Sequence, residues 1–119
     1  AEKLALAAAF HRGLRESVRA GLPIEIVAAP QLTVVAFRLS RLSAEPIEGW
    51  NRRNAAFLDA INGRGRCFLS STLLPSTDGD AVTLRVCILS HRTHVRQIHH
   101  CLEDVRLTAN AGASSAREV

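Results

Sequence analysis

The sequence predicts an α+β domain, a two-layer sandwich in which a mainly antiparallel sheet of three or four strands carries helices on one face. Three observations lead to this prediction. Some segments have apolar residues at helical spacing. Between them lie strand-like segments, in which apolar and polar residues alternate or all residues are apolar. Their order is helix, strand, strand, helix, strand, strand, helix. The length of 119 residues suits one domain built around a single core.

The first helix is predicted over residues 2–20, and Gly21 is placed to end it. Its apolar residues recur at helical spacing. They are Leu4, Ala7, Phe10, Leu14 and Val18.

Two strands are predicted next. In "LPIEIVAAPQ", Ile24 and Ile26 alternate with Glu25 before Pro30, a pattern typical of a short strand at a sheet edge. The run "LTVVAFRLS" predicts a longer and more buried strand.

The middle helix follows a loop that we expect over residues 40–49, where Ser, Pro and Gly occur together. Asn51 is expected to cap this helix, and the two glycines of "NGRG" at residues 62–65 to close it. Its inward stripe consists of Trp50, Asn54, Phe57, Leu58 and Ile61.

The last part of the chain predicts a hairpin and a final helix. "RCFLSSTLL" and "AVTLRVCIL" are predicted strands, joined by a turn in "PSTDGD". Thr93 is the expected N-cap of the last helix. Its apolar residues are Val95, Ile98, Cys101, Leu102 and Val105. We therefore expect a domain over residues 1–109 and a frayed tail over residues 110–119.

Composition excludes several classes of protein. Hydrophobic residues make up 47% and charged residues 22%, which argues against disorder, collagen and coiled coil. No apolar run is long enough to cross a bilayer, and the signal-peptide pattern is absent, so we expect a cytoplasmic protein without a membrane partner. The three cysteines lie in apolar segments and are expected to be buried thiols rather than a disulfide framework.

The charge pattern gives no sign of a nucleic-acid partner. The net charge is +4, but the arginines are scattered along the chain, which is typical of solvated faces. The chain contains no Met, and we interpret it as a piece of a longer reading frame. The single lysine, Lys3, falls in the first helical turn and is a poor candidate for a nucleophile.

Arg85 is the candidate binding residue. Strand alternation places Val82, Leu84 and Val86 on the face toward the helices and Arg85 on the opposite face. A guanidinium in the middle of a strand needs a partner, and its planar fork suits a carboxylate or a phosphate. The alternatives are an ion pair within the chain, or a solvent-facing arginine whose stem lies on the sheet.

The histidines do not predict a metal site. No pair among His94, His99 and His100 has the i, i+4 spacing of a helical zinc site, and nothing is placed to complete a site at His91 and His94. There is also no nucleophile elbow and no glycine-rich phosphate loop. We expect neither a metal nor a complete catalytic site in this chain.

Three stretches resemble a known family in their order and spacing. They are "IEIVAAPQLTVVAFRLS", "NAAFLDAINGRGRCFLSST" and "LRVCILSHRT" with the valine and leucine positions that follow. From about Leu4 to Thr108 the chain is similar to the C-terminal small domain of the group II pyridoxal-phosphate-dependent decarboxylases, the family of the aromatic-L-amino-acid, glutamate, histidine and diaminobutyrate decarboxylases.

The resemblance implies a fragment of a fold-type I enzyme, a lyase that is inactive without its large domain. Pyridoxal 5'-phosphate would bind to that large domain and not to this chain. The partners implied are the large domain, a second subunit in a homodimer and an amino-acid substrate. Arg85 matches the family arginine associated with the substrate carboxylate or its surroundings. Decarboxylation requires that carboxylate to be held perpendicular to the cofactor ring. Arg38 matches another recurring arginine, and we expect it to pack or to lie at a domain interface.

One alternative interpretation is a related fold-type I enzyme with another activity, such as an aminotransferase or a desulfurase. Another is a free-standing ferredoxin-like module that binds a small anionic ligand or RNA. The shortage of aromatic residues disfavours RNA, because RNA-binding sheets stack bases on aromatic side chains.

Overall fold

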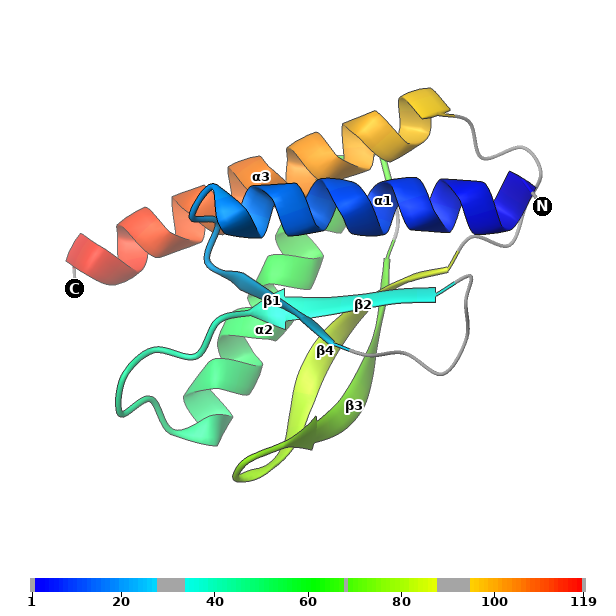
Figure 1. Ribbon diagram of the computed structural model, residues 1–119. Coiled ribbons are helices and arrows are strands. Elements are labelled where there is room, and N and C mark those ends of the chain that lie inside the picture. The colour runs from blue at the N-terminus through cyan, green and yellow to red at the C-terminus, as the bar shows by residue number, and fades with distance from the viewer. Residues whose placement is uncertain (1, 28–33, 68, 88–94, 119) are drawn as a thin grey trace.

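The computed structural model describes residues 2–27, 34–67, 69–87 and 95–118. Seven elements follow in the predicted order (Figure 1), which confirms the α+β class. They are α1 (Glu2–Arg19), β1 (Ile24–Val27), β2 (Val34–Leu39), α2 (Ile47–Gly63), β3 (Ser70–Ser76), β4 (Gly79–Cys87) and α3 (Val95–Glu118).

The four strands form one antiparallel sheet in the order β1-β2-β4-β3. β1 lies at an edge, as its short alternating pattern predicted, and all six residues of β2 are buried. β3 and β4 form the predicted hairpin, in which Ser76 pairs with Gly79 around a two-residue turn. Gly79 has a φ of 130°, a conformation that residues with a Cβ rarely adopt, so the turn depends on this glycine.

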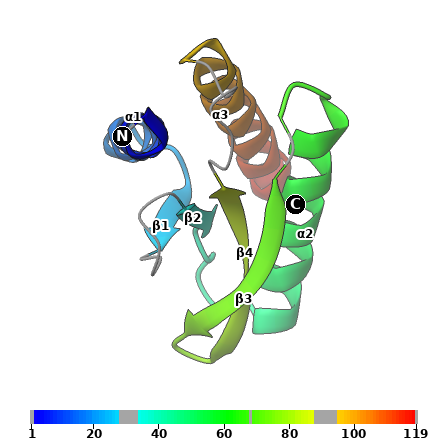
Figure 2. The same ribbon diagram turned by 90° about the vertical axis from the view of Figure 1, so that its right-hand side faces the viewer.

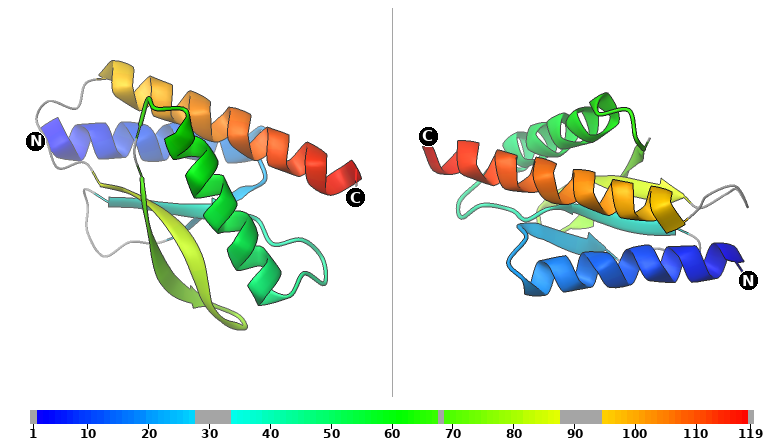
Figure 3. Two further views of the ribbon diagram at one scale, coloured as in Figure 1. Left: turned by 180° about the vertical axis from the view of Figure 1, so that it is seen from behind. Right: turned by 90° about the horizontal axis from the view of Figure 1, so that it is seen from above.

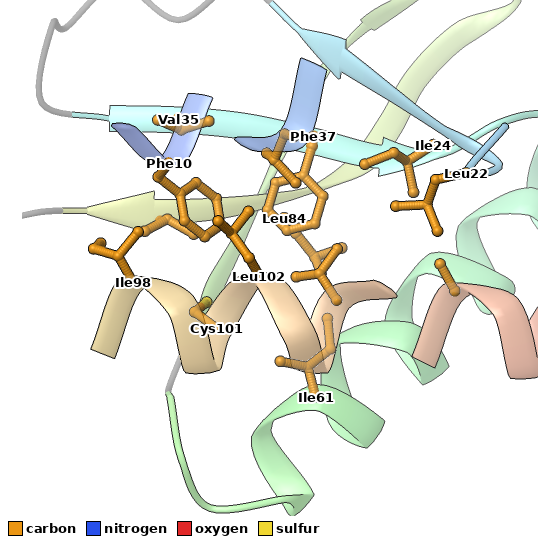
Figure 4. Close-up of a cluster of buried hydrophobic side chains, with 14 of the residues drawn as sticks. Phe10, Leu22, Ile24, Val35, Phe37, Ile61, Leu84, Ile98, Cys101 and Leu102 are labelled. Atoms are coloured by element: carbon orange, nitrogen blue, oxygen red, sulfur yellow. The ribbon is translucent and has the colours of Figure 1, made fainter. Parts of the chain in front are cut away.

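The helices gather on one side of the sheet (Figure 2), and α3 lies between α1 and α2 (Figure 3). Alternate residues of the two central strands point toward them, and register places Phe37 beside Leu84. Both side chains are fully buried, and Phe10 of α1 and Leu102 of α3 pack into the same cluster (Figure 4). Burying apolar side chains of this size contributes about 1.5–3 kcal/mol each, so this layer is the main source of stability.

Three boundaries differ from the sequence-based prediction. α2 begins at Ile47 with Pro46 as its N-cap, so Asn51 lies inside the helix and does not cap it. Proline suits a helix start because it lacks the N–H that would otherwise be unpaired there. β3 begins at Ser70 instead of Arg66. α3 continues through residues 110–118, where we expected an irregular tail, and the alanines of this segment have high helix propensity. The expected cap Thr93 lies outside the described residues.

Side chains from the N-terminal half of α2 form hydrogen bonds with the backbone of β2 and β4 beyond the point where the two strands stop pairing with each other. The pairing ends at Phe37 and Leu84, and the next hydrogen-bonded pair in this register would be Leu39 and Val82. Instead, Asn54 Oδ1 accepts the Leu39 N–H at 2.8 Å and Asn51 Oδ1 accepts the Val82 N–H at 2.8 Å. Three side chains of one helix therefore pair the backbone of two splayed strands, since Trp50 Nε1 also donates to the Leu39 carbonyl at 2.8 Å.

Candidate functional site

The candidate site lies on the face of the sheet that points away from the helices. Arg85 stands near the end of β4, between Ala36 of β2 and Ser70 of β3 in register. Leu84 and Val86 on either side of it are buried in the core, whereas Arg85 is exposed. The predicted alternation is therefore correct, and the side chain projects from the outer face.

Arg38 shares this face and is already neutralised within the chain. Its guanidinium forms an ion pair with Glu25 of β1 and donates from Nη1 to Thr83 Oγ1 of β4 at 3.2 Å. It also lies 5.0 Å from the centroid of the Trp50 ring, within the range of a cation–π interaction. Its side chain is only 8% exposed. Arg38 is thus a packing residue that ties β2 to β1, β4 and α2, the first of the two roles expected for it.

Arg85 differs from Arg38 in the charge around it. Its Nε donates to Ser70 Oγ at 3.2 Å, and among the described residues no carboxylate forms an ion pair with it. A guanidinium has five N–H donors, so the hydroxyl of Ser70 leaves most of them available. Ser70 orients the side chain without cancelling its charge. The geometry therefore suits an anion brought to this face from outside the chain.

Hydroxyl groups extend the polar surface around Arg85. Thr72 pairs with Thr83 two residues along the hairpin from the pair of Ser70 and Arg85, so all four side chains share the outer face. Thr83 is buried, Thr72 is half-buried and Ser70 is exposed. The sequence pattern does not reveal Ser70 and Thr72 as neighbours of Arg85, because the register of β3 against β4 depends on where the hairpin turns.

The remaining candidate residues do not come together. His99 is exposed and His100 half-buried on α3, and His91 and His94 lie outside the described residues. The described part of the chain contains no group of three or more side chains able to hold a metal ion. Lys3 lies in the first turn of α1, on the helical layer and not on the face of Arg85. Among the described residues, no helix is long and apolar enough to cross a bilayer.

Solved structures share this fold, although no family model matches the chain and no curated protein resembles it by sequence. The 4-hydroxyphenylacetaldehyde synthase of Rhodiola rosea is 23% identical over 92% of this chain, with a TM-score of 0.70. The tryptophan decarboxylase of Catharanthus roseus, solved with L-tryptophan, is 22% identical over 93%, with a TM-score of 0.71. The TDC of Oryza sativa, solved with PLP, is 18% identical over 92%, with a TM-score of 0.73.

The matches cover nearly all of this chain but only 21–22% of each of those three chains. The chain therefore spans about a fifth of the length of the proteins it resembles. At these identities the comparison establishes the fold, which is the small-domain fold that the sequence resemblance implied.

Proposed function

We propose that this chain is the C-terminal small domain of a pyridoxal-phosphate-dependent amino-acid decarboxylase, and that Arg85 holds the substrate carboxylate. The observation that carries the proposal is the match of 92–93% of the chain to about a fifth of enzymes such as the tryptophan decarboxylase. The exposed Arg85 supports it, because a cation that projects from the outer sheet face has no anionic partner in the described chain.

In this proposal the cofactor binds elsewhere. Pyridoxal phosphate needs a lysine and a phosphate-binding loop, and the described residues do not fit these needs. The only lysine of the sequence is Lys3, in the first turn of α1, and the helices of the described chain do not begin at a glycine-rich loop. A large domain of the same polypeptide would carry the cofactor and cover the outer face of the sheet. The isolated chain would be inactive, and the complete enzyme would be a cytoplasmic homodimer.

The role of Arg85 is to bind and orient. Charge-assisted hydrogen bonds from a planar guanidinium fix both the position and the plane of a carboxylate. In a decarboxylation, orientation decides whether the bond to the carboxylate is aligned with the electron acceptor. Ser70 would limit the rotation of Arg85, since its hydroxyl accepts the Nε proton while the terminal nitrogens have no hydrogen-bond partner among the described residues. Arg85 needs no proton transfer for this role.

An absorbance experiment tests the proposal. The protein is expressed from its complete reading frame, and its visible spectrum is recorded before and after borohydride, with the 119-residue chain as the control. We expect a cofactor band in the longer protein that borohydride abolishes, and no band in the control. Absence of the band from the longer protein, purified with added cofactor, would overturn the assignment in favour of an anion-binding module.

A further inference from the structure

Two thiols meet on the opposite layer of the molecule, away from Arg85. Cys101 lies on α3 in the hydrophobic core, beside Ile98 and Leu102 (Figure 4), and is 4% exposed. Cys67 lies in the connection between α2 and β3, packed against the same core but only half-buried. Both are free thiols, and Cys67 packs against the core cluster that contains Cys101. Cys67 is thus partly exposed to solvent, whereas Cys101 is buried.

An ionic cluster around the buried Asp104 holds together the two segments that carry the thiols. Asp104 lies one helical turn after Cys101 and is fully buried. It accepts hydrogen bonds from Arg64 Nε at 3.0 Å and from Arg66 Nε at 3.2 Å, and Arg66 Nη2 also contacts it. Arg66 directly precedes Cys67, so this cluster anchors the α2–β3 connection to the face of α3 that carries Cys101. The segment that carries Cys67 is therefore held against the segment that carries Cys101 by contacts that do not involve the sulfurs.

The environment assigns different chemistry to the two sulfurs. Interaction with the Cys101 thiol lowers the pKa of the Cys67 thiol, and the charge of Arg66 acts in the same direction, whereas burial and the charge of Asp104 act to raise it. Interaction with the Cys67 thiol raises the pKa of Cys101, and burial raises it further. A thiol with a lowered pKa and solvent access is the one that reacts with oxidants. The buried neighbour is placed to resolve the product.

We propose that Cys67 and Cys101 form a reversible redox site, in which a peroxide oxidises Cys67 and Cys101 then closes an intramolecular disulfide. The Cys67 thiolate attacks one peroxide oxygen, so an S–O bond forms, the O–O bond breaks and hydroxide leaves as water after protonation. Cys101 sulfur then attacks Cys67 sulfur, so an S–S bond forms, the S–O bond breaks and a second water leaves with the Cys101 proton. With hydrogen peroxide, two thiols lose two electrons and two waters form. A dithiol reductant reverses the change.

The disulfide would join the start of the β3–β4 hairpin to α3. The hairpin packs against α2 and β2, and the chain that leads into it reaches α3 through Arg66 and Cys67. A covalent bond there closes a loop from residue 67 to residue 101 and restricts the unfolded chain, so oxidation should raise the melting temperature.

Peptide mapping tests the proposal directly, because trypsin separates the three cysteines. Cys67 falls in the peptide 67–85, Cys87 in 86–92 and Cys101 in 97–106. The protein from the complete reading frame is treated with a small excess of hydrogen peroxide, alkylated, digested and analysed by mass spectrometry. We expect 67–85 joined to 97–106, two hydrogens lighter than their sum, and separated again by a dithiol. Peptides linked through 86–92 instead, or 67–85 and 97–106 recovered unlinked, would overturn the proposal.

Four variants separate the roles of the thiols and of the cluster. Cys101→Ser should leave Cys67 as a sulfenic acid that a dimedone probe traps, while Cys87→Ser should form the disulfide as the wild type does. Glu103→Gln, which loses one exposed contact to Arg66 at 2.9 Å, should keep the wild-type rate. Asp104→Asn should slow disulfide formation several-fold, because the connection loses its anchor. Equal rates in the two last variants, in proteins with native circular dichroism, would contradict the positioning role of Asp104.

Discussion

Asn54 Oδ1 lies 2.8 Å from the backbone nitrogen of Leu39, where a strand partner would otherwise accept that N–H. The amide nitrogen of the same side chain donates to the Trp50 carbonyl one turn earlier in α2, and Asn54 is fully buried. The helix thus replaces a strand at the point where β2 and β4 diverge. A buried asparagine in an otherwise apolar stripe is explained by this pairing, because an unpaired backbone N–H in the core would be strongly destabilising.

Replacing Asn54 by leucine should therefore destabilise the domain by roughly 1–3 kcal/mol, because the Leu39 N–H is left buried and unpaired. Asn51→Leu is the matched comparison. Asn51 accepts the Val82 N–H from the same helix, but this contact is only partly buried and water can replace it. Urea unfolding of both variants gives the two changes in free energy. If the Asn51 variant is as unstable as the Asn54 variant, burial of the backbone N–H does not determine how much stability is lost.

Asp104→Asn should lower the free energy of unfolding at neutral pH, because Arg64 and Arg66 lose their shared buried carboxylate. Burial acts to raise the pKa of Asp104, but the hydrogen bonds from Arg66 and Arg64 outweigh it and hold the pKa below its ordinary value. A carboxyl group with a depressed folded pKa stabilises the protein above its unfolded pKa, about 3.9, and this contribution is lost as pH falls through the folded value.

The stability difference between wild type and Asp104→Asn should thus be constant from about pH 5 to 7 and shrink below about pH 4. Urea unfolding at several pH values measures it, with Glu103→Gln as the exposed control. If the difference in unfolding free energy grew as the pH fell, the ionised Asp104 carboxylate would not be the source of the stabilisation.

Gly13→Ala should destabilise the protein although alanine favours helix by about 1 kcal/mol. A Cβ at Gly13 would lie 2.5 Å from Leu102 Cδ1 and 3.1 Å from Leu102 Cδ2, and Leu102 is buried between α1 and α3. Overpacking of this kind costs about 1–3 kcal/mol. Gly63→Ala is the control, because a Cβ there meets nothing within 4 Å.

Thermal unfolding of the two glycine variants separates the gain in helix propensity from the cost of overpacking. We expect a lower melting temperature for Gly13→Ala and an unchanged or higher one for Gly63→Ala. A stabilised Gly13→Ala would mean that Leu102 repacks freely, and that the glycine is not needed for the close approach of α1 to α3.

The fold could be predicted from the sequence because its elements carry strong local patterns. Helical spacing around Phe10 and Phe57, and alternation around Leu84, each fix an element and its inward face without reference to the rest of the chain. The predicted boundaries are wrong where tertiary contacts determine the end of an element. Asn51 has the chemistry of a helix cap, but a helix that starts at Ile47 turns the same amide toward β4.

The candidate site was predictable only in part. Strand alternation was enough to place Arg85 on the outer face. Its contact with Ser70 depends on the register of a hairpin whose turn uses Thr77 and Asp78, which the wider "PSTDGD" signal did not locate. The pairing of Cys67 with Cys101 depends on how the α2–β3 connection crosses α3, for which the sequence contains no periodic signal.

The most direct test of the proposed function is the steady-state kinetics of Arg85→Ala in the protein from the complete reading frame, with carbon dioxide release from a panel of amino acids as the assay. Arg12→Ala, on the exposed surface of α1, is the matched control. Loss of about 1.5–3 kcal/mol of charge-assisted binding predicts that kcat/KM falls roughly 10- to 100-fold in Arg85→Ala alone, with cofactor absorbance and circular dichroism unchanged. Kinetics equal to those of Arg12→Ala and the wild type would contradict the account and leave Arg85 as a solvent-facing residue of the sheet.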